Sequence, residues 1–239
     1  MNGLQLILRS SAFYIGYISS AIIAGCVACI LGPLLTLEAR LKVFSLWPRF
    51  VNWFLYSTCR ISVSVEGKEN IPKGPHIIVS NHQGQWETFY FQYLFFPMIT
   101  ILKRELLYIP LWGWGMYFLR PIAINRKRPT TALKKIIKEG IERLNKGLCV
   151  LFFPEGTRNK PREIGKYASS AFLLSLRSGV PLLPVVHNSG DCWPAHRFVK
   201  RPGTIFLRIG KPIKVGMKAR EAAKVVEAWS RKNLQQINV

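Results

Sequence analysis

The sequence predicts an α/β fold in which a largely parallel sheet is flanked by helices and preceded by an N-terminal apolar helical membrane anchor. Short apolar strands alternate with longer helical segments along most of the chain, which is typical of parallel sheets. Residues 10–37 contain no charged side chain. A chain of 239 residues can form one sizeable domain and an appendage but would crowd two domains. We therefore divide it into residues 1–58, an anchor with an interfacial helix, and residues 59–239, the α/β domain.

The uncharged N-terminal run is long enough to cross a bilayer. As a helix it would extend about 42 Å, whereas the hydrocarbon core is about 30 Å thick. Basic residues are denser after the run than before it, which favours a cytoplasmic location for the rest of the chain. Residues 23–26 resemble a lipoprotein processing site, but the apolar run continues past Cys26, which favours a retained anchor over a cleaved signal peptide. Gly32-Pro33 could break the helix, so a spanning helix and a bent hairpin both stay open.

Residue patterns define the elements of the α/β domain in order. Ile61, Val63 and Val65 alternate with polar residues, as in a half-buried strand. Proline and glycine mark many of the other boundaries. Further strands are expected at residues 76–79, 99–102, 121–125, 148–153, 180–186 and 204–209. Helices are expected at residues 86–96, 106–119 and 165–178, from Thr130 or Thr131 to 145, and from about 217.

The charge balance is strongly basic, with 34 Lys and Arg against 12 Asp and Glu and a net charge of +22. Such a charge attracts nucleic acid, anionic lipid or phosphorylated substrates. The basic residues are spread over the chain without a zinc-finger, helix-turn-helix or RNA-binding pattern, so no nucleic acid partner is expected. With the apolar segment, the charge indicates an anionic membrane surface. Lys134, Lys135 and Lys138 form either a solvated helix face or a contact with lipid headgroups.

The five cysteines do not form a disulfide framework, because their number is odd and their spacing irregular. Cys26 and Cys29 form a Cys-x-x-Cys pair, but the pair lies inside the apolar run and has no partner pair at metal-ligand spacing. We interpret both as small packing residues of a helix, and we expect no metal site.

The segment 81–87 carries the first candidate for catalysis. An expected strand leads into His82, and Glu87 lies five residues later in the first turn of the next helix. A carboxylate there can fix one imidazole nitrogen and leave the other free to take a proton from a hydroxyl. No serine or cysteine occupies a nucleophile elbow, so direct attack by the hydroxyl is favoured over a covalent enzyme intermediate. Backbone amides near this loop are expected to stabilise an oxyanion.

Three further segments follow expected strands, where an open α/β sheet places its site. In residues 153–158, Gly156 permits close approach or a positive φ, and Arg158 offers a fork of donors suited to phosphate. Residues 122–126 end in Arg126, which begins a run of three cations that is either a phosphate site or a solvated loop. Residues 180–190 are mainly structural, although His187 is considered as a second base.

These four segments, in this order, resemble the glycerolipid acyltransferase superfamily and, more narrowly, bacterial 1-acylglycerol-3-phosphate acyltransferases. That family has a His–four residues–acid motif, a strand ending in Arg, a Pro-Glu-Gly-Thr-Arg turn and a final Val-Pro strand. Residues 102–110 and 202–213 also look like family segments. The resemblance covers roughly residues 60–215 and makes residues 59–239 an expected acyltransferase domain.

The resemblance implies a role for each matching residue. His82 would be the general base and Glu87 its orienting partner. The phosphate of a lysophosphatidic acid acceptor would be bound by Arg126, Arg158 and Lys103. The acceptor-site turn would be shaped by Glu155, Gly156 and Thr157, without direct chemistry by Glu155. The donor would be acyl-CoA or acyl-carrier protein, both acidic, and neither a metal nor an organic cofactor is expected.

Two departures from the family pattern bear on the substrate. The acid of the first motif is usually Asp, whereas this chain has Glu87. Residues 167–171 lack the Lys and Gly of a Tyr-Lys-Ser-Gly-like run, for which Lys166 is a possible substitute. The predicted reaction is acylation of the sn-2 hydroxyl of lysophosphatidic acid at the cytoplasmic membrane. Another lysolipid acceptor and a non-catalytic lipid-binding protein are the alternatives.

Overall fold

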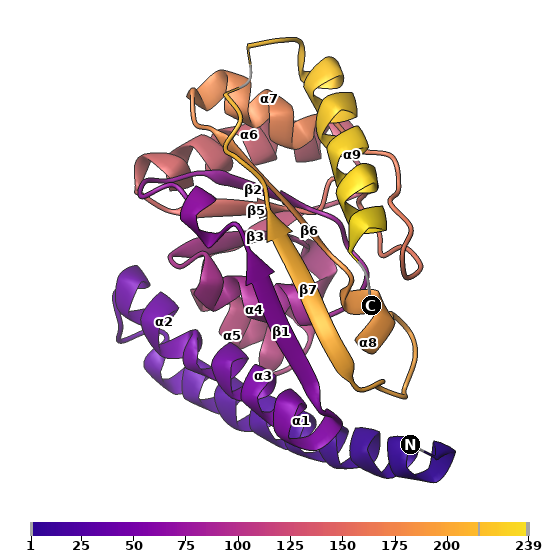
Figure 1. Cartoon of the computed structure of the whole chain (residues 1–239). Coiled ribbons are helices and arrows are strands. Elements are labelled where there is room, and N and C mark those ends of the chain that lie inside the picture. Colours follow the sequence, from indigo (N-terminus) through magenta and orange to yellow (C-terminus); the bar gives the residue numbers. More distant parts are fainter. Residues whose placement is uncertain (1, 215, 238–239) are drawn as a thin grey trace.

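The computed structural model describes residues 2–214 and 216–237 and contains a seven-stranded sheet covered by helices on both faces (Figure 1). The strands are β1 (Ile61–Glu66), β2 (Ile77–Ser80), β3 (Met98–Lys103), β4 (Ile122–Ile124), β5 (Cys149–Phe152), β6 (Leu182–His187) and β7 (Gly203–Ile209). The helices are α1 (Gly3–Leu31), α2 (Leu37–Phe44), α3 (Leu46–Cys59), α4 (Trp86–Leu94), α5 (Trp112–Phe118), α6 (Pro129–Asn145), α7 (Ser170–Ser178), α8 (Ser189–Cys192) and α9 (Ala219–Gln236), with 3-10 turns η1 (Lys68–Asn70) and η2 (Arg104–Tyr108).

The sheet has the strand order β1-β7-β6-β2-β5-β3-β4. All neighbouring strands are parallel except β6 and β7, which run antiparallel. The predicted α/β class with a largely parallel sheet is therefore confirmed. Since β2, β3, β4, β5 and β6 are parallel, their carboxyl ends meet at one edge, and this edge receives the segments that the sequence singled out.

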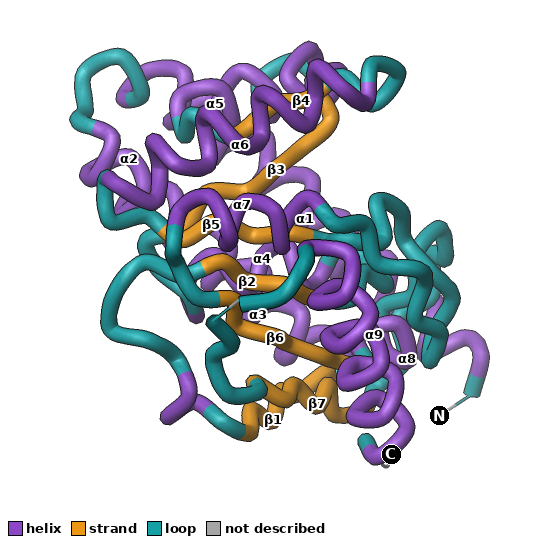
Figure 2. The backbone as a smooth tube through the Cα atoms, turned by 90° about the horizontal axis from the view of Figure 1, so that it is seen from above, coloured by secondary structure: helices purple, strands orange, loops and turns teal. Residues whose placement is uncertain are grey.

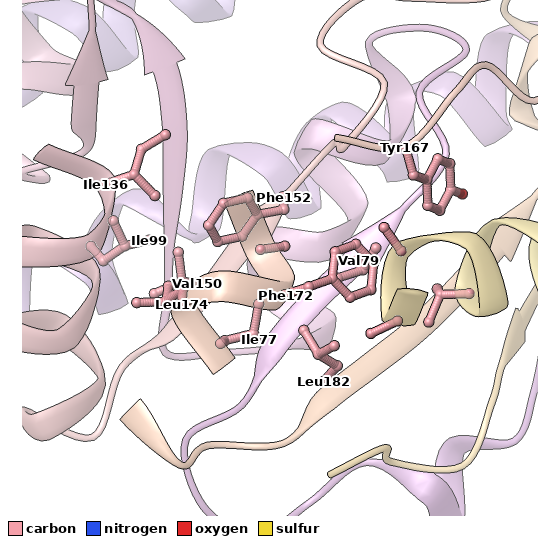
Figure 3. Packing of buried hydrophobic residues seen from close by; sticks show 14 of the residues in the cluster. Ile77, Val79, Ile99, Ile136, Val150, Phe152, Tyr167, Phe172, Leu174 and Leu182 are labelled. Carbon is pink, nitrogen blue, oxygen red and sulfur yellow. The ribbon is translucent and has the colours of Figure 1, made fainter. Parts of the chain in front are cut away.

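Two apolar cores hold the layers together, one on each face of the sheet. Alternate residues of a strand serve opposite faces, so Ile77 and Val79 belong to one core and Ile78 to the other. The first core joins the sheet to α6, α7 and α9, and Figure 3 shows side chains from these strands and helices packed together. The second joins it to α1, α3 and α4. In the tube view from above, α6, α7 and α9 likewise lie over the strands (Figure 2).

Helix α1 lies along the domain instead of projecting from it (Figure 1). It is the one helix among the described residues that is long and apolar enough to cross a membrane. It ends at Leu31, just before Gly32-Pro33, as that pair suggested. One face packs against α3 and α5, where Gly16 meets Phe54 and Gly25 meets Leu111. The opposite face exposes aliphatic side chains to the surroundings.

Three predicted elements were wrong in type or extent. The helix expected at 106–119 is divided into η2 and α5, because Pro110 lacks the amide that a continuous helix requires. The helix expected from residue 165 begins at Ser170, since residues 165–168 are held in a loop by Glu155 and Glu227. Helix α6 begins at Pro129 instead of being capped by Thr130 or Thr131, as proline fits the first helical turn.

Candidate active site

The loop after β2 and the turn after β5 lie side by side at the carboxyl edge of the sheet. The backbone amide of His82 donates to Glu155 Oε2 at 2.8 Å, and the amide of Asn159 donates to the carbonyl of His82 at 2.8 Å. The two strands are direct neighbours in the sheet, paired at Ile77 with Val150. The structure therefore brings together the first two segments that the sequence singled out.

His82 and Glu87 form a hydrogen-bonded pair. The imidazole Nδ1 lies 2.8 Å from Glu87 Oε1, which also accepts the backbone amides of Gln83 and Gly84 at 2.8 Å each. The hydroxyl of Ser189 donates to Glu87 Oε2 at 2.9 Å. The carboxylate is fully buried at the start of α4, so four donors take the place of water around it.

The electrostatics of the pair fix the position of the imidazole proton. Burial alone would raise the pKa of Glu87, but the nearby imidazoles of His187 and His82 and the amide of Gly84 outweigh it and hold the pKa well below its usual range. The carboxylate is therefore ionised at neutral pH and accepts a hydrogen bond from the Nδ1–H of His82. Nε2 has no hydrogen-bond partner in residues 2–214 and 216–237, and the His82 side chain is 14% exposed. This is the geometry of a general base.

The ring of Phe153 fixes the plane of the imidazole. The two rings stack with their centroids 4.0 Å apart and an interplanar angle of 13°. Phe153 follows β5 directly, so the strand sets the ring's position. With Nδ1 bound to Glu87 and one face covered by Phe153, His82 has little rotational freedom and presents Nε2 in a defined direction.

His187 is buried and both of its ring nitrogens have hydrogen-bond partners, so it does not fit the role of a second base. Its Nε2 lies 3.0 Å from the carbonyl of Asn81, and its Nδ1 accepts the amide of Ser189 at 3.3 Å. Burial lowers the pKa of His187, while the Glu87 carboxylate acts in the opposite direction. The Asn81 side chain also pairs with the His187 backbone, at 2.9 and 3.1 Å. These contacts tie the end of β6 to the loop that carries His82.

The turn after β5 is shaped by Glu155 and Gly156. Glu155 accepts the amides of His82 and Gly165 on its two oxygens, at 2.8 and 2.9 Å, while burial raises its pKa. Gly156 has a φ of +70°, the left-handed conformation that glycine adopts without strain. Thr157 is exposed beside it. Glu155 thus aligns two backbone segments, which agrees with a structural rather than a chemical role.

Three cationic residues were expected to bind phosphate, and all three follow neighbouring strands. Lys103 ends β3 and pairs in register with Ile124, two residues before Arg126. The Arg126 guanidinium donates to the carbonyl of Gly156 at 2.7 Å, which ties the end of β4 to the turn. Arg158 is half-buried, and no hydrogen bond or ion pair to it is found in the described part of the chain. Its donors are therefore available to a ligand.

The expected oxyanion donors are not the amides closest to His82. The amides of His82, Gln83 and Gly84 are all bound to carboxylates, and the amide of Gly156 donates to Phe153 at 3.0 Å. An amide that already has a carboxylate partner is a poor donor to a second anion. The loop uses these amides to hold Glu87 and Glu155, so stabilisation of an oxyanion by other amides near the loop stays a prediction.

Sequence reasoning did not identify the loop that follows α8. The carbonyl of Trp193 approaches Gly84 so closely that a Cβ there would lie 2.5 Å from it, and the amide of Ala195 donates to the carbonyl of Gln83. Lys200 is buried, and its Nζ donates to Tyr14 on α1 at 2.7 Å. Burial lowers the pKa of Lys200 to about 8. Residues this far apart in sequence form no local motif, so only the fold reveals that they connect α1 to the catalytic loop.

Comparison with known proteins agrees with the fold. The family model described as Acyltransferase matches residues 62–188, which include His82, Glu87, Lys103, Arg126 and Arg158. The chain therefore belongs to the acyltransferase family and is an enzyme of that family.

Individual relatives narrow the comparison. The chain is 39% identical to a 1-acyl-sn-glycerol-3-phosphate acyltransferase of Pseudomonas aeruginosa over 97% of this chain and 92% of the relative. It is 32% identical to a yeast protein of the same name, from Saccharomyces cerevisiae, over 64% of this chain and 52% of the relative. The crystal structure of the 1-acyl-sn-glycerophosphate (LPA) acyltransferase PlsC from Thermotoga maritima superimposes with a TM-score of 0.81 at 25% identity and covers all of both chains.

Proposed function

We propose that this enzyme transfers a fatty acyl group from a thioester to the sn-2 hydroxyl of lysophosphatidic acid, giving phosphatidic acid in phospholipid biosynthesis. The observation that carries the proposal is the free Nε2 of His82, whose other nitrogen is held by the ionised Glu87. The names of the relatives from Pseudomonas and yeast support the choice of acceptor.

The reaction is a direct transfer. Nε2 of His82 takes the proton of the acceptor hydroxyl as its oxygen attacks the thioester carbonyl carbon. The new C–O bond forms, the C–S bond breaks, and the leaving thiolate takes the proton back from the imidazolium. Glu87 stabilises the imidazolium through Nδ1 without itself becoming protonated, because its pKa is held low.

The acceptor's phosphate would lie against Arg158, with Arg126 and Lys103 contributing from the adjoining strand ends. An arginine fork binds two phosphate oxygens at once, which also sets the orientation of the acceptor. The available donors of Arg158 favour it as the principal contact. We propose acyl-CoA or acyl-carrier protein as the donor, because both are acidic and the chain carries a net charge of +22.

The membrane anchor corresponds to α1, which we propose lies in the surface of the cytoplasmic membrane with the catalytic domain on the cytoplasmic side. One face of α1 is covered by α3 and α5, so the helix is not free to cross a bilayer by itself. Its outward face exposes Ile15, Ile18 and Ile22, and the adjoining α3 and α5 expose Trp53 and Trp114. Aliphatic side chains flanked by tryptophan are typical of an interfacial helix that also meets anionic lipid. The division into 1–58 and 59–239 remains a prediction.

An acceptor panel tests the proposed function. The full chain, purified in detergent and mixed with lipid, is given labelled acyl-CoA or acyl-carrier protein and one of three acceptors: lysophosphatidic acid, lysophosphatidylcholine or 1-acylglycerol. We expect strong turnover of lysophosphatidic acid and weak turnover of the other two. Turnover restricted to acceptors without a phosphomonoester would reject the assigned substrate and favour another lysolipid. Lipid binding without turnover of any acceptor would favour the non-catalytic alternative.

A further inference from the structure

Tyr17 of α1 occupies a fixed position inside an aromatic cluster. Its ring stacks on Phe13 and Trp47, each with a centroid distance of 5.8 Å. It meets Phe89 edge-on at 5.8 Å and Trp193 edge-on at 6.3 Å. Contacts on several sides leave the ring few alternative rotamers, so the direction of its hydroxyl is set by the fold.

The cluster joins Tyr17 to the elements that hold the catalytic pair. Phe89 lies on α4, two residues after Glu87. Trp193 places its carbonyl directly against Gly84 of the catalytic loop. Tyr17 thus contacts two residues whose segments adjoin the His82 loop, although more than sixty residues separate Tyr17 from His82 in sequence.

The hydroxyl of Tyr17 has no hydrogen-bond partner in the part of the chain that the structure describes, and Tyr17 and Arg158 both adjoin the His82 loop. Tyr17 does so through Phe89 and Trp193, and Arg158 through its neighbour Asn159, whose amide donates to the carbonyl of His82. Burial raises the pKa of Tyr17 to about 12, whereas the Arg158 guanidinium acts in the opposite direction. The phenol therefore keeps its proton at neutral pH and remains a hydrogen-bond donor. A donor hydroxyl and an available guanidinium that adjoin the same loop can together form a site complementary to an anion.

We propose that Tyr17 is a further acceptor-binding residue, whose hydroxyl donates a hydrogen bond to the phosphate that Arg158 binds. This inference rests on the proposed function and assigns α1 a part in the active site in addition to its contact with the membrane. An acceptor that approaches from the lipid surface passes α1 before it reaches His82. A headgroup contact on α1 would orient such an acceptor as it enters.

The variant Tyr17→Phe tests the proposal, because it keeps the ring and its packing and removes only the hydroxyl. For lysophosphatidic acid we expect kcat/KM to fall about 10-fold, the range for a lost hydrogen bond to a charged group, with kcat at saturation little changed. For 1-acylglycerol, which lacks the phosphate, we expect the kcat/KM of Tyr17→Phe to equal that of wild type. The matched control Tyr56→Phe removes an exposed hydroxyl from α3 and should behave as wild type.

The possible outcomes separate this proposal from the proposed function. Unchanged kcat/KM in Tyr17→Phe, with active wild type, would overturn the role of Tyr17 alone. An equal loss with both acceptors would also overturn it, because that result assigns Tyr17 to the packing of the catalytic loop. Wild type inactive on lysophosphatidic acid would reject the proposed function itself. If Tyr17 and Arg158 bind the same phosphate, the double variant Tyr17→Phe/Arg158→Lys should lose less kcat/KM for lysophosphatidic acid than the product of the two single losses.

Discussion

The loop that carries His82 and the turn that carries Arg158 end neighbouring strands, yet their polar groups are satisfied in opposite ways. Around Glu87, both carboxylate oxygens accept bonds, from four donors, and no water is needed. Arg158 keeps its guanidinium free of protein partners in the described residues. Proton transfer requires one geometry held in advance, whereas substrate binding requires donors that are still available. Substitutions in the loop should therefore affect kcat, and those at Arg158 should affect kcat/KM.

The largest effect is expected for His82→Ala. Removing the base should lower kcat by about 10²–10⁴-fold, the usual contribution of general-base catalysis. Association with lipid vesicles should be unchanged, because His82 is distant in sequence from α1 and contributes nothing to its outward face. Turnover of labelled acyl-CoA and co-sedimentation with vesicles measure the two properties. Activity equal to wild type would remove His82 from the mechanism and leave a lipid-binding role for the site.

A smaller loss in kcat is expected for Glu87→Asp. The side chain is shorter by about 1.5 Å, one carbon–carbon bond, so the carboxylate cannot reach all four of its donors without a shift of α4. We expect kcat to fall about 10–100-fold, and thermal stability to fall because buried amides lose a partner. Steady-state kinetics and a melting curve measure both. Glu221→Asp, on exposed α9, is the matched control.

Retention of full activity by Glu87→Asp would show that the loop adjusts to the shorter acid. In that case the geometry of the loop would be fixed by the contacts of the His82 backbone with Glu155 and Asn159, and not by the contacts of the Glu87 carboxylate. The His82 loop would still be more rigid than the turn that carries Arg158, but its rigidity would have a different physical cause.

The sequence was sufficient for the sheet and for the catalytic pair, because both depend on local patterns. Apolar runs flanked by glycine and proline located all seven strands, and the spacing of His82 and Glu87 predicted their contact. The prediction of one helix at 106–119 was wrong, because the composition of the segment is helical but Pro110 interrupts the helix. Ser189 and Lys200 could not be predicted, since each acts on a partner about a hundred or more residues away. The particular oxyanion donors could not be read from the sequence for a related reason: an amide's partner depends on tertiary contacts.

The variant Arg158→Lys tests the turn after β5, where the guanidinium is available to a ligand. Lysine keeps the charge but loses the planar fork, so it binds phosphate as a point charge. We expect kcat/KM for lysophosphatidic acid to fall about 10-fold while kcat stays within about two-fold, since one charge-assisted hydrogen bond is lost. Arg220→Lys, on the exposed start of α9, is the matched control. A loss confined to kcat would show that Arg158 acts on the reacting groups instead of on the headgroup.

The smallest effect is expected for the double variant Lys134→Gln/Lys138→Gln, which addresses the two interpretations of the basic face of α6. Both lysines are exposed, and α6 packs on the first core while α1 packs on the second, so the sheet separates them (Figure 1). If α1 marks the membrane side, these lysines face solvent, and binding to anionic vesicles should stay within about two-fold of wild type, as surface charges beyond a Debye length are screened. Ile18→Glu/Ile22→Glu in α1 should instead release the protein from vesicles, because it places charges on the apolar face. Weaker binding of the lysine variant to anionic but not to neutral vesicles would assign α6 to headgroup contact and require the membrane to meet the domain from another side.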